Sequence, residues 1–504
     1  MRKSFILIIS LTLFLFCQTK LLAQFPYQST LTDGKEFSQL NPNRQVTFDK
    51  YGATLTTSST NLTRGFYLND MAFTIDRGFI IEFDYIMTGG RGFADGLSLV
   101  LFDGVVTSPK MGADGSGLGY AYKKPTTSDG GLSKGFLAVG IDVWGNFKLR
   151  RASSEEYRNG IRDGVDNNTL TGGKSGEAKN HVTIRGQGDQ GKGYPVLITQ
   201  STEDFESRAV LDFTTGKYNV KPKAPQATPF SFKLRESISE NENDIAATYG
   251  HPSYRRVEIS MLPGEKEGLK GFFMSVDILH KDQKDRVIND FFLPDDSKIN
   301  YMEAISVRES EDKLAELHLL APKTFKIGFA AATGTYTQRH IVRNLSLYMP
   351  FSPSIRDLFL TDICKDVPTE IDILANSVGF DNNKYQGEGD IHDLGRSDLL
   401  DAYSFQFRTL VNGMYEDTAQ PYIATTNYGT YEYNPATKKA VFTPKKGVAM
   451  PVSDQVFFTI RNKEKVLSDG TNLGSEQFRS NTGTVRLTFG VNCNDILMVN
   501  GNSI

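Results

Sequence analysis

Two short polar segments of the chain place carboxylate and amide side chains at the ends of strand-like apolar runs. The first, Ala94-Asp95-Gly96, follows such a run and a glycine-rich turn. The second, residues 142–146, reads Asp-Val-Trp-Gly-Asn and ends another run. Carboxylates, side-chain amides and backbone carbonyls are the oxygen ligands that hard cations such as calcium take. The side chains of Asp142 and Asn146 and the carbonyl of Trp144 therefore form a candidate cation loop.

The elements that must position these groups are strands, because the flanking runs are rich in β-branched and aromatic residues. They span residues 79–86, 97–102 and 135–141. We expect loops at the strand ends to turn the polar side chains toward one point. The polar stretch 150–179 begins at the candidate cation loop, and we expect it to wrap the site. A plainer explanation also exists for an isolated D-x-W-x-N segment, since Asp and Asn suit turns.

Further metal ligands would have to come from later in the chain. Asp163 and Asp166 lie in the polar stretch and are candidates. His181 begins a predicted strand and is another candidate, although a histidine at such a place is more often simply hydrogen-bonded. The sequence does not decide among these residues.

Four motifs together resemble the L-type lectins, the family of the legume seed lectins and of the mannose-binding cargo receptors of the secretory pathway. They are Ala94-Asp95-Gly96, the segment 115–120 (GSGLGY), the D-x-aromatic-x-N loop at 142–146, and the segment 328–334 (GFAAATG). They occur in the family's order over about 250 residues, which is more specific than any single motif. The resemblance covers residues 24–350.

The resemblance implies a concanavalin A-like jelly-roll sandwich with a calcium-bound sugar site at one end. By position, Asp95 would follow a cis peptide and accept hydrogen bonds from sugar hydroxyls. Asn146 would contact both sugar and calcium, Asp142 and the Trp144 carbonyl would complete the calcium ligands, and loops would close the pocket. The loop residues expected there are Gly115, Ser116, Gly117, Thr335 and Tyr336. Tyr336 or Tyr120 would cover an apolar sugar face.

Two positions depart from the family's pattern. Legume lectins usually carry Glu two residues before the Asp of the calcium loop, and this chain has Gly140 there. A transition-metal site is therefore not expected. Where the pattern places another calcium-binding Asp, this chain has Arg150. Calcium remains the expected cofactor, although its ligand set is incomplete.

The rest of the chain divides into further expected segments. Residues 187–255 and 281–320 exceed what the sandwich needs and are expected to form insertions, with a short helix around 309–319. A boundary is expected near Pro350 and Pro353. Residues 355–493 resemble the bacterial immunoglobulin-like, cadherin-like repeats of surface proteins, which implies a second β-sandwich; residues 494–504 form a tail.

Residues 1–23 read as an export signal, with Arg2 and Lys3 before an apolar run. The mature protein is therefore expected to be secreted or at the cell surface, and no other stretch is apolar enough to span a membrane.

Cys364 and Cys493 would pair in an exported chain; the alternative is two separate thiols. The formal net charge of −3 over 504 residues shows no basic footprint for nucleic acid.

The expected function is calcium-assisted carbohydrate binding without catalysis, with a glycan as the partner. One rival is a structural or adhesive surface protein whose lectin fold has lost its sugar site. The other is an enzyme, because laminarinase-type glycoside hydrolases share the jelly roll. Their E-x-D-x-x-E strand needs two carboxylates, and here Gly140 and Gly145 stand at both Glu positions. The sequence therefore argues against that enzyme chemistry.

Overall fold

The computed structural model describes residues 25–69, 71–125, 130–150, 159–161, 179–223, 228–306, 308–381 and 394–490. Over these residues the regular structure is almost entirely β-strand, with one short α-helix, α2 (Glu242–Ile245), and 3-10 turns at Gly115–Gly117, Glu309–Glu311, Ser397–Leu399 and Glu476–Phe478. The predicted all-β fold class is confirmed. In this part of the chain no helix has the length and apolar character to cross a membrane.

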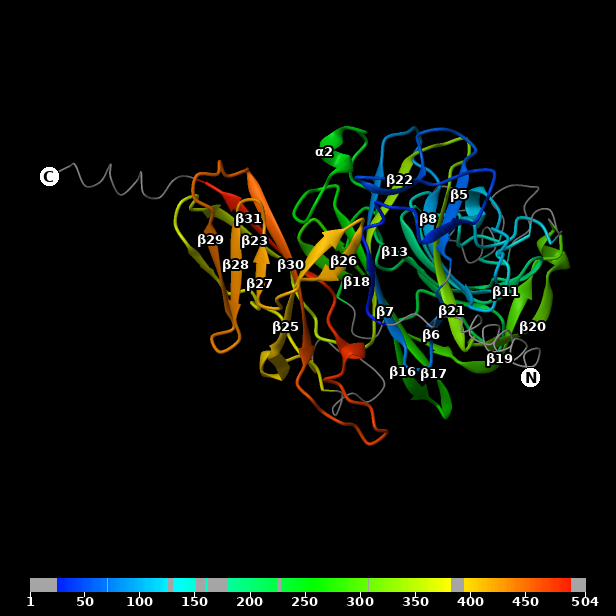
Figure 1. Cartoon of the computed structure of the whole chain (residues 1–504). Coiled ribbons are helices and arrows are strands. Elements are labelled where there is room, and N and C mark those ends of the chain that lie inside the picture. Colours follow the sequence, from blue (N-terminus) through cyan, green and yellow to red (C-terminus); the bar gives the residue numbers. More distant parts are fainter. Residues whose placement is uncertain are drawn as a thin grey trace, which may run out of the picture.

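The strands gather into two bodies that lie side by side in Figure 1. In the N-terminal body, one layer is an eight-stranded sheet of described residues, ordered β18-β17-β16-β7-β22-β4-β3 with β1 on β22. Its strands are β1 (Tyr27–Ser29), β3 (Thr47–Asp49), β4 (Gly52–Thr56), β7 (Phe79–Thr88), β16 (Arg255–Lys266), β17 (Leu269–His280), β18 (Gln283–Pro294) and β22 (Arg339–Tyr348).

The opposite layer is a larger sheet, in which twelve strands of the described residues follow the order β15-β14-β13-β10-β9-β8-β21-β5-β2 with three short strands attached. The strands are β2 (Phe37–Gln39), β5 (Thr63–Leu68), β6 (Phe73–Thr74), β8 (Gly96–Asp103), β9 (Gly135–Asp142), β10 (His181–Arg185), β11 (Gly188–Asp189), β12 (Lys192–Gly193), β13 (Val196–Ser201), β14 (Arg208–Leu211), β15 (Tyr218–Val220) and β21 (Thr324–Ala332). The predicted runs 79–86, 97–102 and 135–141 are thus strands β7, β8 and β9.

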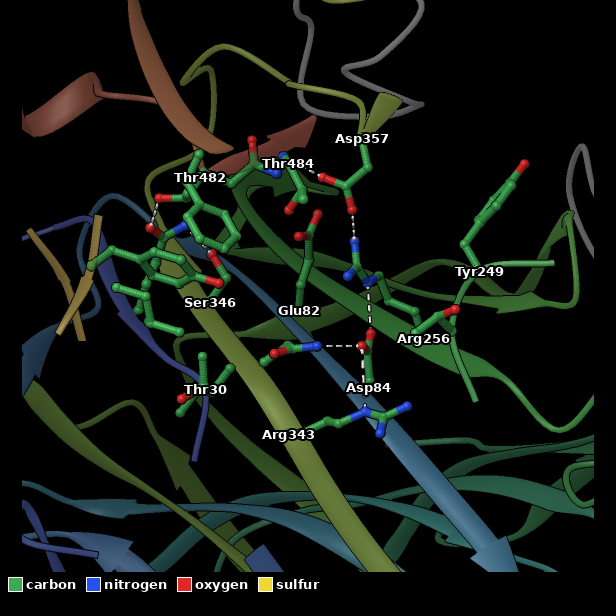
Figure 2. A pocket seen from close by; sticks show the side chains of 18 of the residues that line it. Thr30, Glu82, Asp84, Tyr249, Arg256, Arg343, Ser346, Asp357, Thr482 and Thr484 are labelled. Atoms are coloured by element: carbon green, nitrogen blue, oxygen red, sulfur yellow. Dashed lines mark hydrogen bonds and ion pairs between the residues drawn. The ribbon is translucent and has the colours of Figure 1, made fainter. Parts of the chain in front are cut away.

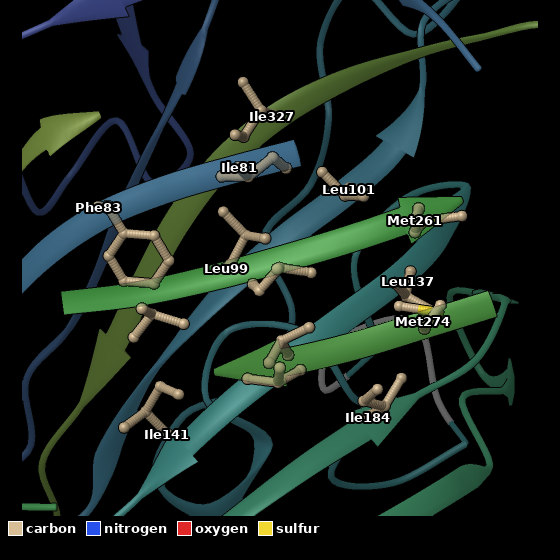
Figure 3. Packing of buried hydrophobic residues seen from close by; sticks show 14 of the residues in the cluster. Ile81, Phe83, Leu99, Leu101, Leu137, Ile141, Ile184, Met261, Met274 and Ile327 are labelled. Carbon is tan, nitrogen blue, oxygen red and sulfur yellow. The ribbon is translucent and has the colours of Figure 1, made fainter. Parts of the chain in front are cut away.

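A hydrophobic core lies between the two layers (Figure 3). Successive side chains of a strand point to opposite faces, and on β7 the alternate residues Phe79, Ile81 and Phe83 belong to this core. Phe83 meets Phe329 of β21 with ring centroids 4.9 Å apart. Burying each such side chain contributes roughly 1.5–3 kcal/mol. The core therefore fixes the register of the strands whose ends carry the polar motifs.

Most of the strands in the segments predicted as insertions, 187–255 and 281–320, belong to the two large sheets. Strands β13, β14 and β15 extend the twelve-stranded sheet, and β18 extends the eight-stranded one. Only β19 (Asp296–Glu303) and β20 (Lys313–Leu320) form a separate two-stranded hairpin among the described residues.

The predicted helix at 309–319 is wrong, because β20 pairs with β19 along its whole length. Leu317 and Leu319 pack on the core with a spacing of two, which is the period of a strand. The leucine-rich composition favoured a helix, but pairing with the neighbouring strand decides the structure.

The C-terminal body has its own two sheets and its own hydrophobic core. One sheet of described residues contains β23 (Leu358–Ile363), β25 (Leu400–Val411), β26 (Met414–Asp417), β30 (Ser453–Asn462) and β31 (Gly483–Phe489); the other contains β24 (Thr369–Ile371), β27 (Ile423–Thr425), β28 (Gly429–Asn434) and β29 (Lys439–Pro444). Phe405 stacks on Tyr433 at 3.8 Å in the core. Cys364 is disulfide-bonded, and its expected partner Cys493 lies outside the described residues. The immunoglobulin-like assignment stays a prediction.

The second body packs on the outer face of the eight-stranded sheet, where β7 presents Glu82 and Asp84. Figure 2 shows the cavity at this junction, which has a volume of about 340 Å³. Arg256 binds Asp84 with Nε–Oδ1 at 2.8 Å and reaches Asp357 of the second body at 3.8 Å. Burial raises the pKa of Asp357. The charged groups of this cavity bind one another, so we interpret the junction as structural.

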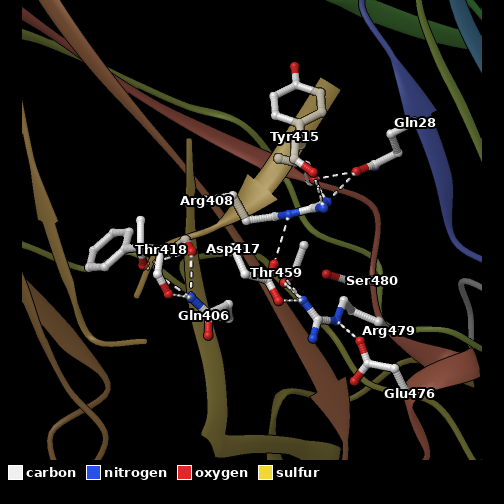
Figure 4. A network of polar contacts seen from close by, with 12 residues as sticks. Gln28, Gln406, Arg408, Tyr415, Asp417, Thr418, Thr459, Glu476, Arg479 and Ser480 are labelled. Carbon is white, nitrogen blue, oxygen red and sulfur yellow. Dashed lines mark hydrogen bonds and ion pairs between the residues drawn. The ribbon is translucent and has the colours of Figure 1, made fainter. Parts of the chain in front are cut away.

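A second polar network joins the two bodies at β1 (Figure 4). The Arg408 guanidinium donates to the Gln28 side chain at 3.0 Å and to the Tyr415 carbonyl at 2.5 Å. The backbone N–H of Thr30 also donates to the Gly413 carbonyl at 3.1 Å. Side-chain and backbone hydrogen bonds together hold the second body against the first.

Candidate functional site

The predicted polar motifs come together around Asp95. The peptide bond between Ala94 and Asp95 is cis. The Asp95 N–H donates to the Ala332 carbonyl at 3.0 Å, and the Trp144 N–H donates to the Asp95 carbonyl at 3.1 Å. The Asn146 amide approaches the Asp95 carboxylate with Nδ2–Oδ1 at 3.4 Å. Backbone hydrogen bonds thus place both polar side chains at one end of the sandwich, as the motifs predicted.

Two glycines of neighbouring loops lie near the Asp95 carboxylate. A Cβ placed on Gly115 would lie 3.9 Å from Asp95 Oδ2, and one on Gly334 would lie 3.8 Å from the same atom. Gly115 has φ of +53°, a conformation that favours glycine. It begins a 3-10 turn in which Ser116 and Gly117 are buried. The expected loops therefore surround Asp95.

An aromatic pair forms the exposed rim of this cluster. The rings of Trp144 and Tyr336 have centroids 4.8 Å apart and are tilted by 36°. Tyr336 is 40% exposed and covers Gly92, where any Cβ would collide with its ring. Thr335 beside it is exposed.

The alternative aromatic, Tyr120, cannot contact a ligand at this rim. It is fully buried, and its hydroxyl donates to the Gly186 carbonyl at 2.9 Å. Tyr120 therefore packs inside the protein. Its position next to a glycine-rich turn gives no sign of this in the sequence.

The recognition loop, which we define as residues 142–150, is closed by contacts of its own. The backbone N–H of Phe147 donates to Asp142 Oδ2 at 2.6 Å. The Phe147 ring lies against Gly140, where a Cβ would come within 2.3 Å of it. The buried Lys148 ammonium group donates to the Gly145 carbonyl. The space beside Gly140 is therefore filled by an aromatic ring.

A charged and a titratable group are buried together behind this loop. Burial lowers the pKa of Lys148 to about 7, opposed by the Asp142 carboxylate. His181 pairs with Asp142 in register across β9 and β10, and its Nδ1 contacts Thr199 Oγ1 at 3.0 Å. Burial, and next the charge of Lys148, hold the pKa of His181 well below its usual range. His181 is thus buried and neutral.

Two buried arginines hold the loop from behind. Arg185 donates to the carbonyls of Phe147 at 2.9 Å, of Leu149 at 3.2 Å and of Tyr194 at 2.6 Å. Arg150 binds Asp312 with Nε–Oδ1 at 2.8 Å, and both side chains are 2% exposed. Sequence reasoning missed Lys148 and Arg185, because their partners are backbone carbonyls, which leave no pattern in the sequence.

The described donors supply fewer oxygens than a calcium ion takes, although the expected ligand Asn146 Oδ1 is buried without a hydrogen-bond partner. Calcium takes six to eight oxygen ligands. No group of three or more His, Cys, Asp and Glu residues that could hold a metal ion occurs within the described ranges. The Asp142 carboxylate binds a backbone N–H and interacts with the Lys148 ammonium group. Asp163 and Asp166 lie outside the described residues, so their part in any site stays a prediction.

A hydrogen-bonded network below the rim requires a neutral histidine. Arg235 donates to Gln338 Oε1 at 2.9 Å, which turns the amide N–H of Gln338 toward His340 Nε2 at 2.9 Å. The other ring nitrogen contacts Thr56 Oγ1 at 2.6 Å. Protonation of Nε2 would set two donors against each other. Burial, and next Arg235, lower the pKa of His340 to about 3.

We expect this histidine to destabilise the fold in acid. Between about pH 6.5 and pH 3 the unfolded chain binds a proton at His340 that the folded chain does not, so stability falls as pH falls. At pH 5 the loss is on the order of 2 kcal/mol. Urea unfolding at pH 7.5 and pH 5 should show it, and His340→Gln should reduce the difference between the two pH values. An equal difference in the variant would contradict this assignment.

Comparisons with known proteins give only remote similarity. No family model matches the chain, and no curated protein matches it. Solved structures that it resembles include the exoplasmic/lumenal domain of VIP36 in a Ca²⁺/Man3GlcNAc-bound form, with 10% identity over 64% of this chain and 87% of that chain and a TM-score of 0.32.

Two other structures are similar at the same level. Lectin I-B4 from Griffonia simplicifolia, in a metal-free form, is 11% identical over 64% of this chain and 98% of its own, with a TM-score of 0.31. The carbohydrate recognition domain of Emp46p, in a potassium-bound form, is 11% identical over 64% and 96%, with a TM-score of 0.30. Similarity this remote assigns no function to the chain.

Proposed function

We propose that the chain binds carbohydrate, without catalysis, at the loop cluster around Asp95. The observation that carries this proposal is the pairing of a carboxylate and an amide beneath an exposed aromatic rim. A carboxylate accepts hydrogen bonds from hydroxyl groups, and an amide both donates and accepts. Asn146 Oδ1 is buried and has no hydrogen-bond partner, so a ligand hydroxyl that reached it would satisfy it.

The rim supplies the apolar half of such recognition. Sugar rings have C–H faces that pack on aromatic side chains, and the exposed Tyr336 ring, which packs against Trp144, offers such a contact. Thr335 adds a polar group at the edge of this surface. Of the nearby basic side chains, Lys148 and Arg150 are buried and bound within the protein. Lys179 is exposed, with its Nζ 5.4 Å from the centre of the Trp144 ring, so the rim carries a positive charge beside its aromatic rings.

The proposed location is outside the cell or on its surface. It is supported by the export-signal pattern of residues 1–23 and by the disulfide bond of Cys364, since disulfides persist in oxidising compartments. Recognition is proposed here without a step through calcium, because the described donors around Asp142 are fewer than that ion takes.

The test is a glycan array followed by titration of the best glycan. Trp144 is the single tryptophan of the chain, so its fluorescence should change when the site is filled. Tyr336→Ala should weaken binding about tenfold, equivalent to about 1.4 kcal/mol of lost aromatic contact. Tyr403→Ala, at a 69% exposed tyrosine of the second body, is the matched control.

Absence of any glycan signal from the folded full chain would overturn the proposal. It would then favour the adhesive alternative, in which the same loops contact a protein. A glycan signal that Tyr336→Ala leaves unchanged would place binding elsewhere on the chain.

A further inference from the structure

We propose that buried basic side chains of this chain, Lys148 foremost, hold the recognition loop in the place of a calcium ion, so that the loop keeps its shape without a bivalent cation. The inference concerns the loop itself, and its first test needs no sugar. It can therefore fail or succeed independently of the proposed carbohydrate binding.

The first support is the position of Lys148. Its side chain is 1% exposed, donates to the Gly145 carbonyl, and interacts with the Asp142 carboxylate. A loop carbonyl and the first loop carboxylate are ligands of the kind that a hard cation would take. When protonated, the ammonium group of Lys148 supplies one positive charge and up to three donors. It donates to the Gly145 carbonyl and is attracted by the Asp142 carboxylate. A bivalent ion added there would meet a like charge in a site closed to solvent.

The second support comes from Gly140 and Arg150, the two positions that depart from the metal-binding pattern. Both have a structural role in this protein. Gly140 leaves room for the Phe147 ring, which packs directly against it. Arg150, in the place of an expected carboxylate, donates to the Ser306 carbonyl at 2.7 Å and to Asp312. It thereby ties the end of the loop to the segment that connects β19 and β20. At both positions the residue that replaces an expected carboxylate makes contacts of its own.

The third support is that Arg185 donates hydrogen bonds to backbone carbonyls of the loop. Its guanidinium lies 4.9 Å from the centre of the Phe147 ring and binds carbonyls at both Phe147 and Leu149. A metal ion draws several backbone oxygens of a loop toward one point, and here a guanidinium does so. Three basic side chains thus bind around one loop: Lys148 the Gly145 carbonyl, Arg150 the Asp312 carboxylate, and Arg185 the carbonyls of Phe147 and Leu149.

The test uses the full chain, melted in chelator and in excess calcium. We expect no shift of the unfolding midpoint and no change in Trp144 fluorescence between the two conditions. Terbium, a luminescent calcium mimic, should give no emission sensitised by Trp144. A midpoint raised by calcium, or terbium emission quenched by calcium, would overturn the proposal.

A substitution tests the role of the lysine directly. Lys148→Met, which keeps the length of the side chain and removes the charge, should lower the midpoint by roughly 5 °C or more and shift the Trp144 emission. Lys110→Met, at an exposed lysine, is the matched control. A Lys148→Met protein as stable as this control would overturn the proposal. If that variant does not fold, the metal titrations of the unmodified chain still decide.

Discussion

Asp95→Asn is expected to weaken carbohydrate binding roughly 30- to 100-fold with little effect on folding. Hydrogen bonds to a charged acceptor contribute about 1.5–3 kcal/mol each, and the carboxylate would lose its charge. The new amide would also bring its own N–H groups near those of Asn146, whose Nδ2 now lies 3.4 Å from Asp95 Oδ1. Titration of the best glycan against Trp144 fluorescence measures the loss.

The matched control for this variant is Asp114→Asn. Asp114 carries an exposed carboxylate next to the same 3-10 turn, and it pairs at 3.3 Å with Lys123. Exposed pairs of this kind contribute little. Equal affinities of the Asp95→Asn protein and the control would show that Asp95 does not contact the ligand.

Arg185→Met is expected to cause the largest loss of stability. The guanidinium is fully buried and donates to carbonyls of Phe147, Leu149 and Tyr194, which the methionine would leave without donors. Leaving buried polar groups unpaired costs about 1–3 kcal/mol each, so a loss of roughly 4 kcal/mol is reasonable after relaxation. The unfolding midpoint should fall by on the order of 10 °C.

Calorimetry of the variant and of Arg396→Met measures this effect. Arg396 is an exposed arginine whose pair with Asp398 lies at the surface, with side chains 57% and 67% exposed. Its loss should change stability by less than about 1 kcal/mol. If both variants melted alike, the carbonyl contacts of Arg185 would not be what holds the loop.

Sequence reasoning anticipated which polar side chains lie together, but not the residues that support them. Asp95, Asn146, Gly115 and Tyr336 come from motifs far apart in the chain, and the structure brings them together. Strand patterns explain part of this result, because Asp95 directly precedes β8 and Asp142 ends β9, and these strands pair at that end. Gly115 and Tyr336 lie in loops, whose course the strand patterns do not give. Gly115 was informative for a separate reason, since its φ of +53° is a conformation that favours glycine.

The buried basic residues could not be predicted in the same way. A lysine or arginine in a sequence is usually solvated, and nothing local shows that Lys148 and Arg185 point inward. Their partners are backbone carbonyls of a folded loop, which have no side-chain signature. The β19–β20 hairpin was missed for a related reason, because the leucines of 313–320 suit a helix until a neighbouring strand is present.

Strand β7 joins the two halves of the molecule mechanically. One face of it packs in the core, its other face carries Asp84 at the junction with the second body, and its far end leads into the turn before Asp95. A force applied between the C-terminal body and a ligand at the loops would therefore run along this strand. The hydrogen bonds of β7 to β16 and β22 would share this force. We therefore expect the force to be transmitted without a bend between the two bodies.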